Sequence, residues 1–89
     1  MHRTSRPQIV LFSRRGCHLC EQAEDMLSCL VPEAKVVDVD AEPGCAALYG
    51  ERVPVVEIDG VVALEGRFDE PQLRAAIRRD SGRDDQARR

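Results

Sequence analysis

The stretch IVLFSRRGCHLC, residues 9–20, decides how this chain folds. Its four consecutive apolar residues predict a buried strand, which the polar Ser-Arg-Arg-Gly segment ends. Two cysteines with two residues between them, Cys17 and Cys20, then stand at the head of a helical pattern. This spacing lets the two sulfurs bond when oxidised and keeps them close when reduced. The segment therefore predicts a strand, a turn and a helix whose first turn carries a thiol–disulfide couple.

The position of the cysteine pair favours thiolate chemistry. A helix N-terminus presents unpaired N–H groups and a partial positive charge, both of which stabilise a thiolate. Arg14 and Arg15 supply nearby basic residues, which act in the same direction. The alternative is a structural zinc site, but such a site needs four ligands, usually from two such pairs, and the sequence has no second pair. We therefore interpret the motif as a redox centre without a metal.

The rest of the chain alternates between helix and strand. A stripe of apolar residues at helical spacing follows Cys17, and Pro32 ends it. The segments 8–13, 35–40, 53–58 and 61–64 are predicted strands, and 45–49 is a predicted short helical turn. The first strand, helix and second strand form a βαβ unit, in which the strands run parallel.

Two local signals define the C-terminal half. Asp59-Gly60 lies between the last two strands and predicts a hairpin turn of type I′. Asp69 and Gln72 stand three residues apart and predict a capping box at the start of a final helix, 69–79. The predicted fold class is therefore α/β, a mixed four-stranded sheet flanked by helices in the order β-α-β-(short α)-β-β-α.

Length and charge limit the domain organisation and the partners. We expect a flexible arm at 1–7, one domain at 8–79, and a charged, disordered tail at 80–89, which lacks apolar periodicity. The net charge of −3 argues against a nucleic-acid partner. Because no apolar run suits a signal peptide or a membrane span, we expect a cytoplasmic monomer without a membrane partner. Structural disulfides are rare in the cytoplasm, so a CxxC there is catalytic or metal-binding.

Together with the cysteine pair, Val53-Pro54 at the start of the third strand resembles the glutaredoxin-like branch of the thioredoxin superfamily. The resemblance covers residues 8–79. In this family the proline is cis and packs beside the disulfide, and the backbone of the preceding residue pairs with the substrate. The resemblance thus implies these roles for Pro54 and Val53. It also implies a thiol–disulfide oxidoreductase that takes part in electron transport. The expected substrate is a disulfide-containing protein or a small thiol, and the expected electron donor is a thiol or a reductase. No bound organic cofactor is expected.

Two departures from the family pattern concern its substrates. The cysteines enclose His18-Leu19, whereas glutaredoxins typically have Pro-Tyr and thioredoxins Gly-Pro at these positions. The Gly-Gly and acidic residue that help glutaredoxins hold glutathione correspond to the segment 65–69, which retains Gly66 and a displaced Asp69. Arg67 replaces the second glycine, so we expect glutathione to be a weakly held co-substrate.

The residues around the pair have distinct expected roles. Cys17 is the exposed cysteine and attacks a substrate disulfide, and Cys20 then attacks Cys17 to release the product. His18 either stabilises the thiolate and moves a proton or is an exposed residue that shapes partner contacts. Arg15, like Arg14, either tunes the thiolate, contacts an acidic partner, or belongs to a solvated loop.

Two further cysteines and two rival functions complete the sequence-based expectations. We expect Cys29 to be a small buried apolar residue and Cys45 to be structural, with regulatory oxidation of Cys45 as the alternative. The first rival function is a metal or iron–sulfur carrier that uses the same cysteine pair, as in some glutaredoxin relatives. The second is an adaptor protein that retains the fold and in which the cysteines do little.

Overall fold

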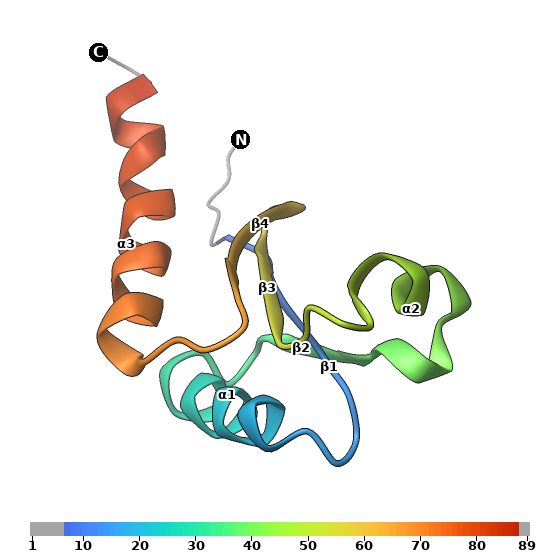
Figure 1. The fold of residues 1–89 in the computed structure, drawn as a ribbon. Helices are drawn as coiled ribbons and strands as arrows, with labels where there is room; N and C mark the ends of the chain where they lie inside the picture. Colours follow the sequence, from blue (N-terminus) through green and yellow to red (C-terminus); the bar gives the residue numbers. More distant parts are fainter. Residues whose placement is uncertain (1–6, 88–89) are drawn as a thin grey trace.

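The computed structural model describes residues 7–87, so residues 1–6 of the predicted arm and residues 88–89 of the predicted tail lie outside the described part (Figure 1). Within it, the strands are β1 (Ile9–Ser13), β2 (Lys35–Asp38), β3 (Val55–Ile58) and β4 (Val61–Glu65). The helices are α1 (His18–Leu30), the 3₁₀ helix η1 (Val39–Ala41), α2 (Pro43–Tyr49) and α3 (Glu70–Ala87). The strands form one sheet in the order β2-β1-β3-β4, with β1 and β2 parallel and the other pairs antiparallel. This confirms the predicted fold class.

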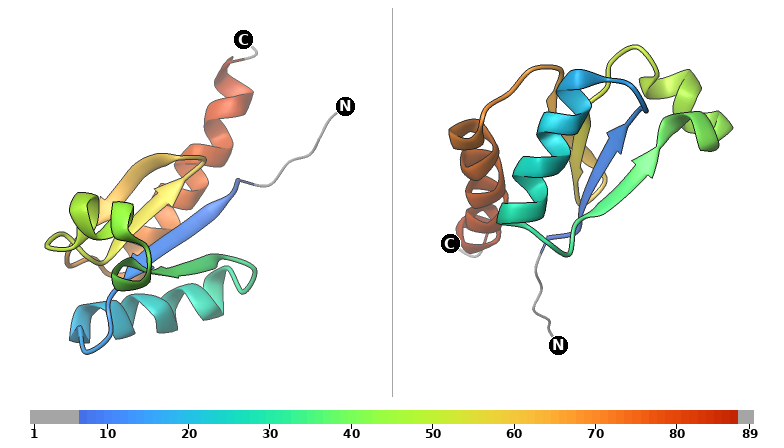
Figure 2. Two further views of the ribbon diagram at one scale, coloured as in Figure 1. Left: turned by 90° about the vertical axis from the view of Figure 1, so that its right-hand side faces the viewer. Right: turned by 90° about the horizontal axis from the view of Figure 1, so that it is seen from below.

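Helices cover both faces of the sheet. Figure 2 shows α1 and α3 side by side on one face and α2 on the other. The alternation of side chains along β1 explains this arrangement. Ile9 and Leu11 belong to the apolar cluster that includes residues of α1 and α3, whereas Phe12 belongs to a second cluster with Tyr49 of α2. A strand buried on both faces has to be apolar throughout, which is why β1 begins with four apolar residues.

The larger cluster is the main hydrophobic core. Leu11 of β1, Leu27 of α1 and Leu73 of α3 are all fully buried in it. On the opposite face, the rings of Phe12 and Tyr49 lie 4.9 Å apart between centroids and are tilted by 53°, a geometry that aromatic pairs favour. The core therefore fixes α1 and α3 firmly, while a smaller aromatic contact fixes α2.

The two local signals in the C-terminal half are confirmed. In the turn between β3 and β4, both Asp59 (φ 54°) and Gly60 (φ 83°) have positive φ, as a type I′ turn requires. At the start of α3, the Gln72 N–H donates to Asp69 Oδ1 and the Asp69 N–H donates to Gln72 Oε1, both at 2.9 Å. This reciprocal pair is a capping box, and it fixes where α3 begins.

The second predicted strand is too long. β2 ends at Asp38, and Val39–Ala41 form η1. The Asp38 side chain accepts the N–H of Asp40 at 2.9 Å, a local bond that competes with continuation of the strand. Val39 is fully buried in the turn, so its apolar character does not indicate a strand at this point.

The predicted tail is also wrong for residues 80–87, which continue α3 to Ala87. The prediction relied on the absence of apolar periodicity after residue 79. The segment contains no proline, the residue that would break the helix outright, so α3 continues without an apolar stripe although Gly82 and three aspartates favour helix less. No helix among residues 7–87 is both long enough and apolar enough to cross a membrane.

Replacing a buried leucine and an exposed leucine by alanine removes the same atoms from two environments, and comparing the two variants tests the packing of α3. Leu73 is fully buried, whereas Leu48 on α2 is 63% exposed. We expect Leu73→Ala to lower the free energy of unfolding by about 2–5 kcal/mol. The matched variant Leu48→Ala should lower it by less than about 0.5 kcal/mol. Urea unfolding followed by far-UV circular dichroism measures both, and equal losses would contradict the placement of α3 in the core.

Candidate functional site

Cys17 is the N-cap residue of α1. Its backbone is extended (φ −96°, ψ 113°), and its Sγ accepts a hydrogen bond from the N–H of Cys20 at 3.2 Å. The side chain of an N-cap residue normally accepts such a bond through an oxygen atom, and here a half-buried sulfur takes that place. The sulfur therefore lies where the free N–H groups of the helix concentrate positive potential. This confirms that the pair stands at the start of the helix.

Cys20 occupies a different environment one turn further along α1. Its side chain is fully buried, and this burial, together with hydrogen bonding to Cys17, raises the pKa of the Cys20 thiol to about 12. A hydrogen bond from the Arg14 backbone acts in the opposite direction, and the negative charge of Glu24 adds to the rise. Cys20 is therefore a neutral thiol at physiological pH. The predicted difference in exposure between the two cysteines is confirmed.

A polar pair lies on the same face of α1 as Cys20. The buried hydroxyl of Ser13 donates to Glu24 Oε2 at 2.8 Å. Glu24 follows Cys20 by four residues, which places both on one side of the helix. The bond anchors the first turns of α1 to the end of β1, so the strand directly supports the helix that carries both cysteines.

The loop between β1 and α1 makes a tight turn. Cys17 N–H donates to the carbonyl of Arg14 at 3.3 Å, and Gly16 has a positive φ of 76°, which favours glycine. Arg15 and His18 are exposed beside this turn. Within residues 7–87 neither side chain makes a hydrogen bond or an ion pair, so both are available to a molecule that approaches Cys17.

The structure connects two other predicted site residues, Pro54 and Gly66. The Val53–Pro54 peptide bond is cis, as the resemblance implied, and Pro54 is buried while Val53 is half-buried. The N–H of Gly66 donates to the Pro54 carbonyl at 2.8 Å, and Gly66 has a positive φ of 74°. The turn that follows β4 is thereby attached to the proline segment.

A shallow groove lies next to this turn. It has a volume of about 470 Å³, and its lining includes Gln22 and Met26 of α1 and Arg67 and Phe68 from the segment that precedes α3. Arg67 is exposed. The replacement for the second glycine of the glutaredoxin pattern is therefore a surface arginine at the edge of a groove beside α1.

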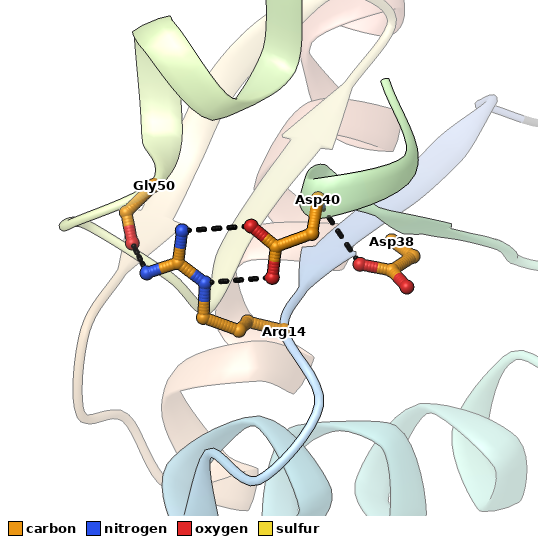
Figure 3. Close-up of polar contacts among 4 residues, drawn as sticks. All are labelled: Arg14, Asp38, Asp40 and Gly50. Carbon is orange, nitrogen blue, oxygen red and sulfur yellow. Dashed lines mark hydrogen bonds and ion pairs between the residues drawn. The ribbon is translucent and has the colours of Figure 1, made fainter. Parts of the chain in front are cut away.

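Sequence reasoning missed the contacts of Arg14. Its guanidinium group forms a bidentate ion pair with Asp40 of η1, with Nε–Oδ2 at 3.0 Å and Nη2–Oδ1 at 2.9 Å (Figure 3). Its Nη1 also donates to the carbonyl of Gly50, after α2, at 2.8 Å. Hydrogen bonding to Asp40 raises the pKa of Arg14, and the same bond lowers the pKa of Asp40. No local pattern signals partners that lie 26 and 36 residues away.

The expectation for Cys29 is wrong, because its side chain is exposed on α1. Cys29 follows the buried Leu27 by two residues, which turns it about 200° around the helix axis and away from the core. Cys45 is half-buried and packs against the cluster of Phe12 and Tyr49, in agreement with a structural role. Among residues 7–87, no three side chains of the types His, Cys, Asp and Glu come together to hold a metal ion.

A sheet of this topology, with a CxxC pair at the first helix and a cis proline before β3, defines a thioredoxin-like domain, and comparisons with known proteins agree. Residues 8–78 match the glutaredoxin-like domain family (DUF836). An uncharacterized protein of Mycobacterium tuberculosis is 38% identical over 86 residues, covering 86% of this chain and 89% of the relative. The chain therefore belongs to the glutaredoxin-like domain family.

Two solved structures extend the comparison. A structural genomics target protein from X. campestris has 35% identity and a TM-score of 0.67, over 75% of this chain and 91% of that protein. A thioredoxin variant from Halobacterium salinarum has 30% identity and a TM-score of 0.62, over 84% of this chain and 74% of that protein. The fold of this chain is thus shared with proteins that include a thioredoxin.

Alkylation of the reduced protein tests the environment of Cys20. In a Cys17→Ser variant, we expect iodoacetamide to modify exposed Cys29 readily at about pH 8 and to leave Cys20 unmodified, because burial keeps Cys20 protonated. Modification of Cys20 should begin only at a pH well above that at which Cys29 reacts, because burial, the largest cause of the raised pKa of Cys20, remains in this variant. Mass spectrometry of proteolytic peptides resolves the two sites. Equal rates for Cys20 and Cys29 at about pH 8 would contradict the assignment of Cys20 as a buried thiol.

Proposed function

We propose that this protein is a thiol–disulfide oxidoreductase that reduces disulfides of proteins or small molecules, with Cys17 as the nucleophile and Cys20 as the resolving cysteine. One observation carries the proposal: the half-buried sulfur of Cys17 accepts a helix N–H bond at 3.2 Å, and the fully buried Cys20 lies behind it. Family membership and the cysteine usage of the sequence support this activity in the cytoplasm.

In the first step, the Cys17 thiolate attacks one sulfur of the substrate disulfide. A bond forms between Cys17 and that sulfur, the substrate S–S bond breaks, and the other substrate sulfur leaves as a thiolate. The N–H of Cys20 and the positive end of the α1 dipole stabilise negative charge on Cys17 in this step. Of the two sulfurs, Cys17 is the one that a substrate reaches, because Cys20 is fully buried.

In the second step, the Cys20 thiol releases its proton to the solvent, and the resulting thiolate attacks the sulfur of Cys17. The internal Cys17–Cys20 disulfide forms and the remaining substrate sulfur leaves as a thiolate, so two electrons have passed to the substrate. The raised pKa of Cys20 keeps it protonated until the mixed disulfide has formed. A thiol or a reductase then supplies two electrons and returns the pair to the dithiol.

The substrate docks beside the Val53–Pro54 segment in this proposal. The half-buried Val53 precedes the cis bond and has backbone groups outside β3, and the family resemblance gives this residue the backbone pairing with substrate. Arg15 and His18 are exposed beside Cys17 in the sequence, and in this proposal they contact the partner. In this proposal, the segment between β4 and α3 determines only whether glutathione or a protein is the preferred substrate.

The division of roles between the cysteines has a direct test. We expect Cys17→Ser to abolish reduction of insulin disulfides, because the nucleophile is lost. Cys20→Ser should instead accumulate a mixed disulfide on Cys17, because the resolving thiol is missing. Mass spectrometry of the trapped adducts identifies the attached sulfur. Cys29→Ser serves as the matched control, since Cys29 is exposed on the same helix, and it should retain full turnover. An active Cys17→Ser variant would refute the proposal.

The turn at Gly66 and Arg67 predicts weak use of glutathione. A glycine allows the backbone to approach a ligand closely, and the side chain of Arg67 obstructs this approach although its charge attracts carboxylates. We therefore expect slow turnover of a glutathione mixed disulfide when glutathione is the only reductant. Arg67→Gly should raise this rate and leave insulin reduction unchanged. A faster reaction of the native protein than of Arg67→Gly would make Arg67 a glutathione contact.

A further inference from the structure

Arg14 connects three segments that are distant in the sequence. It belongs to the loop between β1 and α1, Asp40 to η1, and Gly50 to the end of α2. Figure 3 shows the guanidinium group directed away from α1 and into the space between the other two segments. All three segments meet at the same end of the central strands. Ser13 at the end of β1 pairs with Asp38 at the end of parallel β2, and Phe12 pairs with Val55 at the start of antiparallel β3, which follows Gly50.

The backbone of Arg14 contacts the reactive loop at the same time. Its carbonyl accepts the Cys17 N–H at 3.3 Å. Main chain and side chain of one residue thus contact Cys17 and the η1–α2 region. Displacement of this region relative to Cys17 requires breakage of at least one of these contacts.

The partners of the guanidinium group are themselves fixed. The Asp38 side chain accepts the N–H of Asp40 at 2.9 Å, which holds η1 in place. At position 50, a Cβ atom would lie 2.6 Å from the carbonyl oxygen of Ala46 and 3.1 Å from Nη2 of Arg14. A side chain at position 50 would therefore collide with the backbone of Ala46 and crowd the end of the Arg14 side chain, and glycine avoids both contacts.

We propose that Arg14 is a positioning residue of the thiol site, whose guanidinium group holds the segment from Gly50 to Pro54 at a fixed distance from the loop that bears Cys17. The proposal rests on the proposed function, in which substrate bound to Cys17 also pairs with Val53. Only Glu51 and Arg52 separate Gly50 from Val53, and the N–H of Arg52 donates to the Tyr49 carbonyl at 2.8 Å, which keeps this connection short.

We expect the Arg14–Asp40 pair to fix the relative position of the segments that it joins and to add little to the global stability of the fold. The side chains of Arg14 and Asp40 are 38% and 50% exposed, and exposed ion pairs add little to the free energy of unfolding. A planar fork with two bonds to Asp40 and a third to Gly50 nevertheless defines one orientation. Lysine cannot reproduce this arrangement, because its ammonium is a point charge on a flexible chain.

The experiment compares Arg14→Gln, Asp40→Asn and the double variant with the native protein in the reduction of insulin disulfides. We expect each single variant to raise KM about 10-fold, because displacement of a docking segment weakens substrate positioning. The double variant should show no further loss beyond that of Arg14→Gln, since the contact with Asp40 is already absent once the guanidinium group is removed. Arg14→Lys should resemble Arg14→Gln. Arg74→Gln removes an exposed ion pair with Glu70 on α3 and serves as the matched control with unchanged KM.

Two further measurements separate positioning from other roles. The rate at which iodoacetamide alkylates Cys17 should stay within about two-fold of the native rate in Arg14→Gln, because the helix N–H groups that face Cys17 remain. Amide NMR shifts should change from Gly50 to Val53 in both single variants, and urea midpoints should match that of Arg74→Gln.

The outcomes distinguish this proposal from the proposed function. If the native protein is active and Asp40→Asn has an unchanged KM, or if Arg14→Lys is fully active, the positioning role is overturned. The oxidoreductase function would still stand in either case. If the increases in KM of the two single variants add up in the double variant, Arg14 acts independently of Asp40. That result would also overturn the positioning role. A native protein that reduces no disulfide would overturn the oxidoreductase function and, with it, the positioning role.

Discussion

The burial of one face of α1 against the sheet is the constraint on which the rest of this molecule depends. Cys20, Ala23 and Leu27 share this face and are almost completely excluded from solvent. Burial of such side chains is the main source of stability in a domain of this size. Because Cys20 belongs to the packed face, its thiol is held inside the protein, and Cys17 is left at the exposed end of the helix. Packing therefore gives two neighbouring cysteines different exposure, and burial is the largest cause of the raised pKa of Cys20.

The same constraint explains how polar contacts are distributed around the pair. The N–H groups at the start of α1 have no partners within the helix, and Cys17 Sγ accepts one of them. Ser13 and Glu24 form a hydrogen bond behind the first turns. Arg14 is directed the other way, toward Asp40 and Gly50. Ser13 and Arg14 thus fix the start of the short β1–α1 loop to α1 on one side and to η1 and Gly50 on the other, and Cys17 lies at the end of this loop.

Much of the architecture could be predicted from local patterns. The hairpin followed from Asp59-Gly60, because few residues tolerate the positive φ values found there. The start of α3 followed from Asp69 and Gln72, which bond each other reciprocally. The errors arose where a pattern was ambiguous. Val39 is apolar because it is buried in η1 rather than because it continues β2, and residues 80–87 form helix without an apolar stripe.

By itself, the sequence determined the order of elements, the pairing of Cys17 with Cys20 at a helix start, and the proline before β3, since spacing and residue type specify such features locally. Only the tertiary structure decided which cysteines are accessible and where the charges of the reactive loop are directed. Burial of Cys20 and exposure of Cys29 depend on how α1 is rotated against the sheet. The Arg14–Asp40 pair depends on the parallel alignment of β1 and β2, because contacts between residues distant in the chain form only when the strands align.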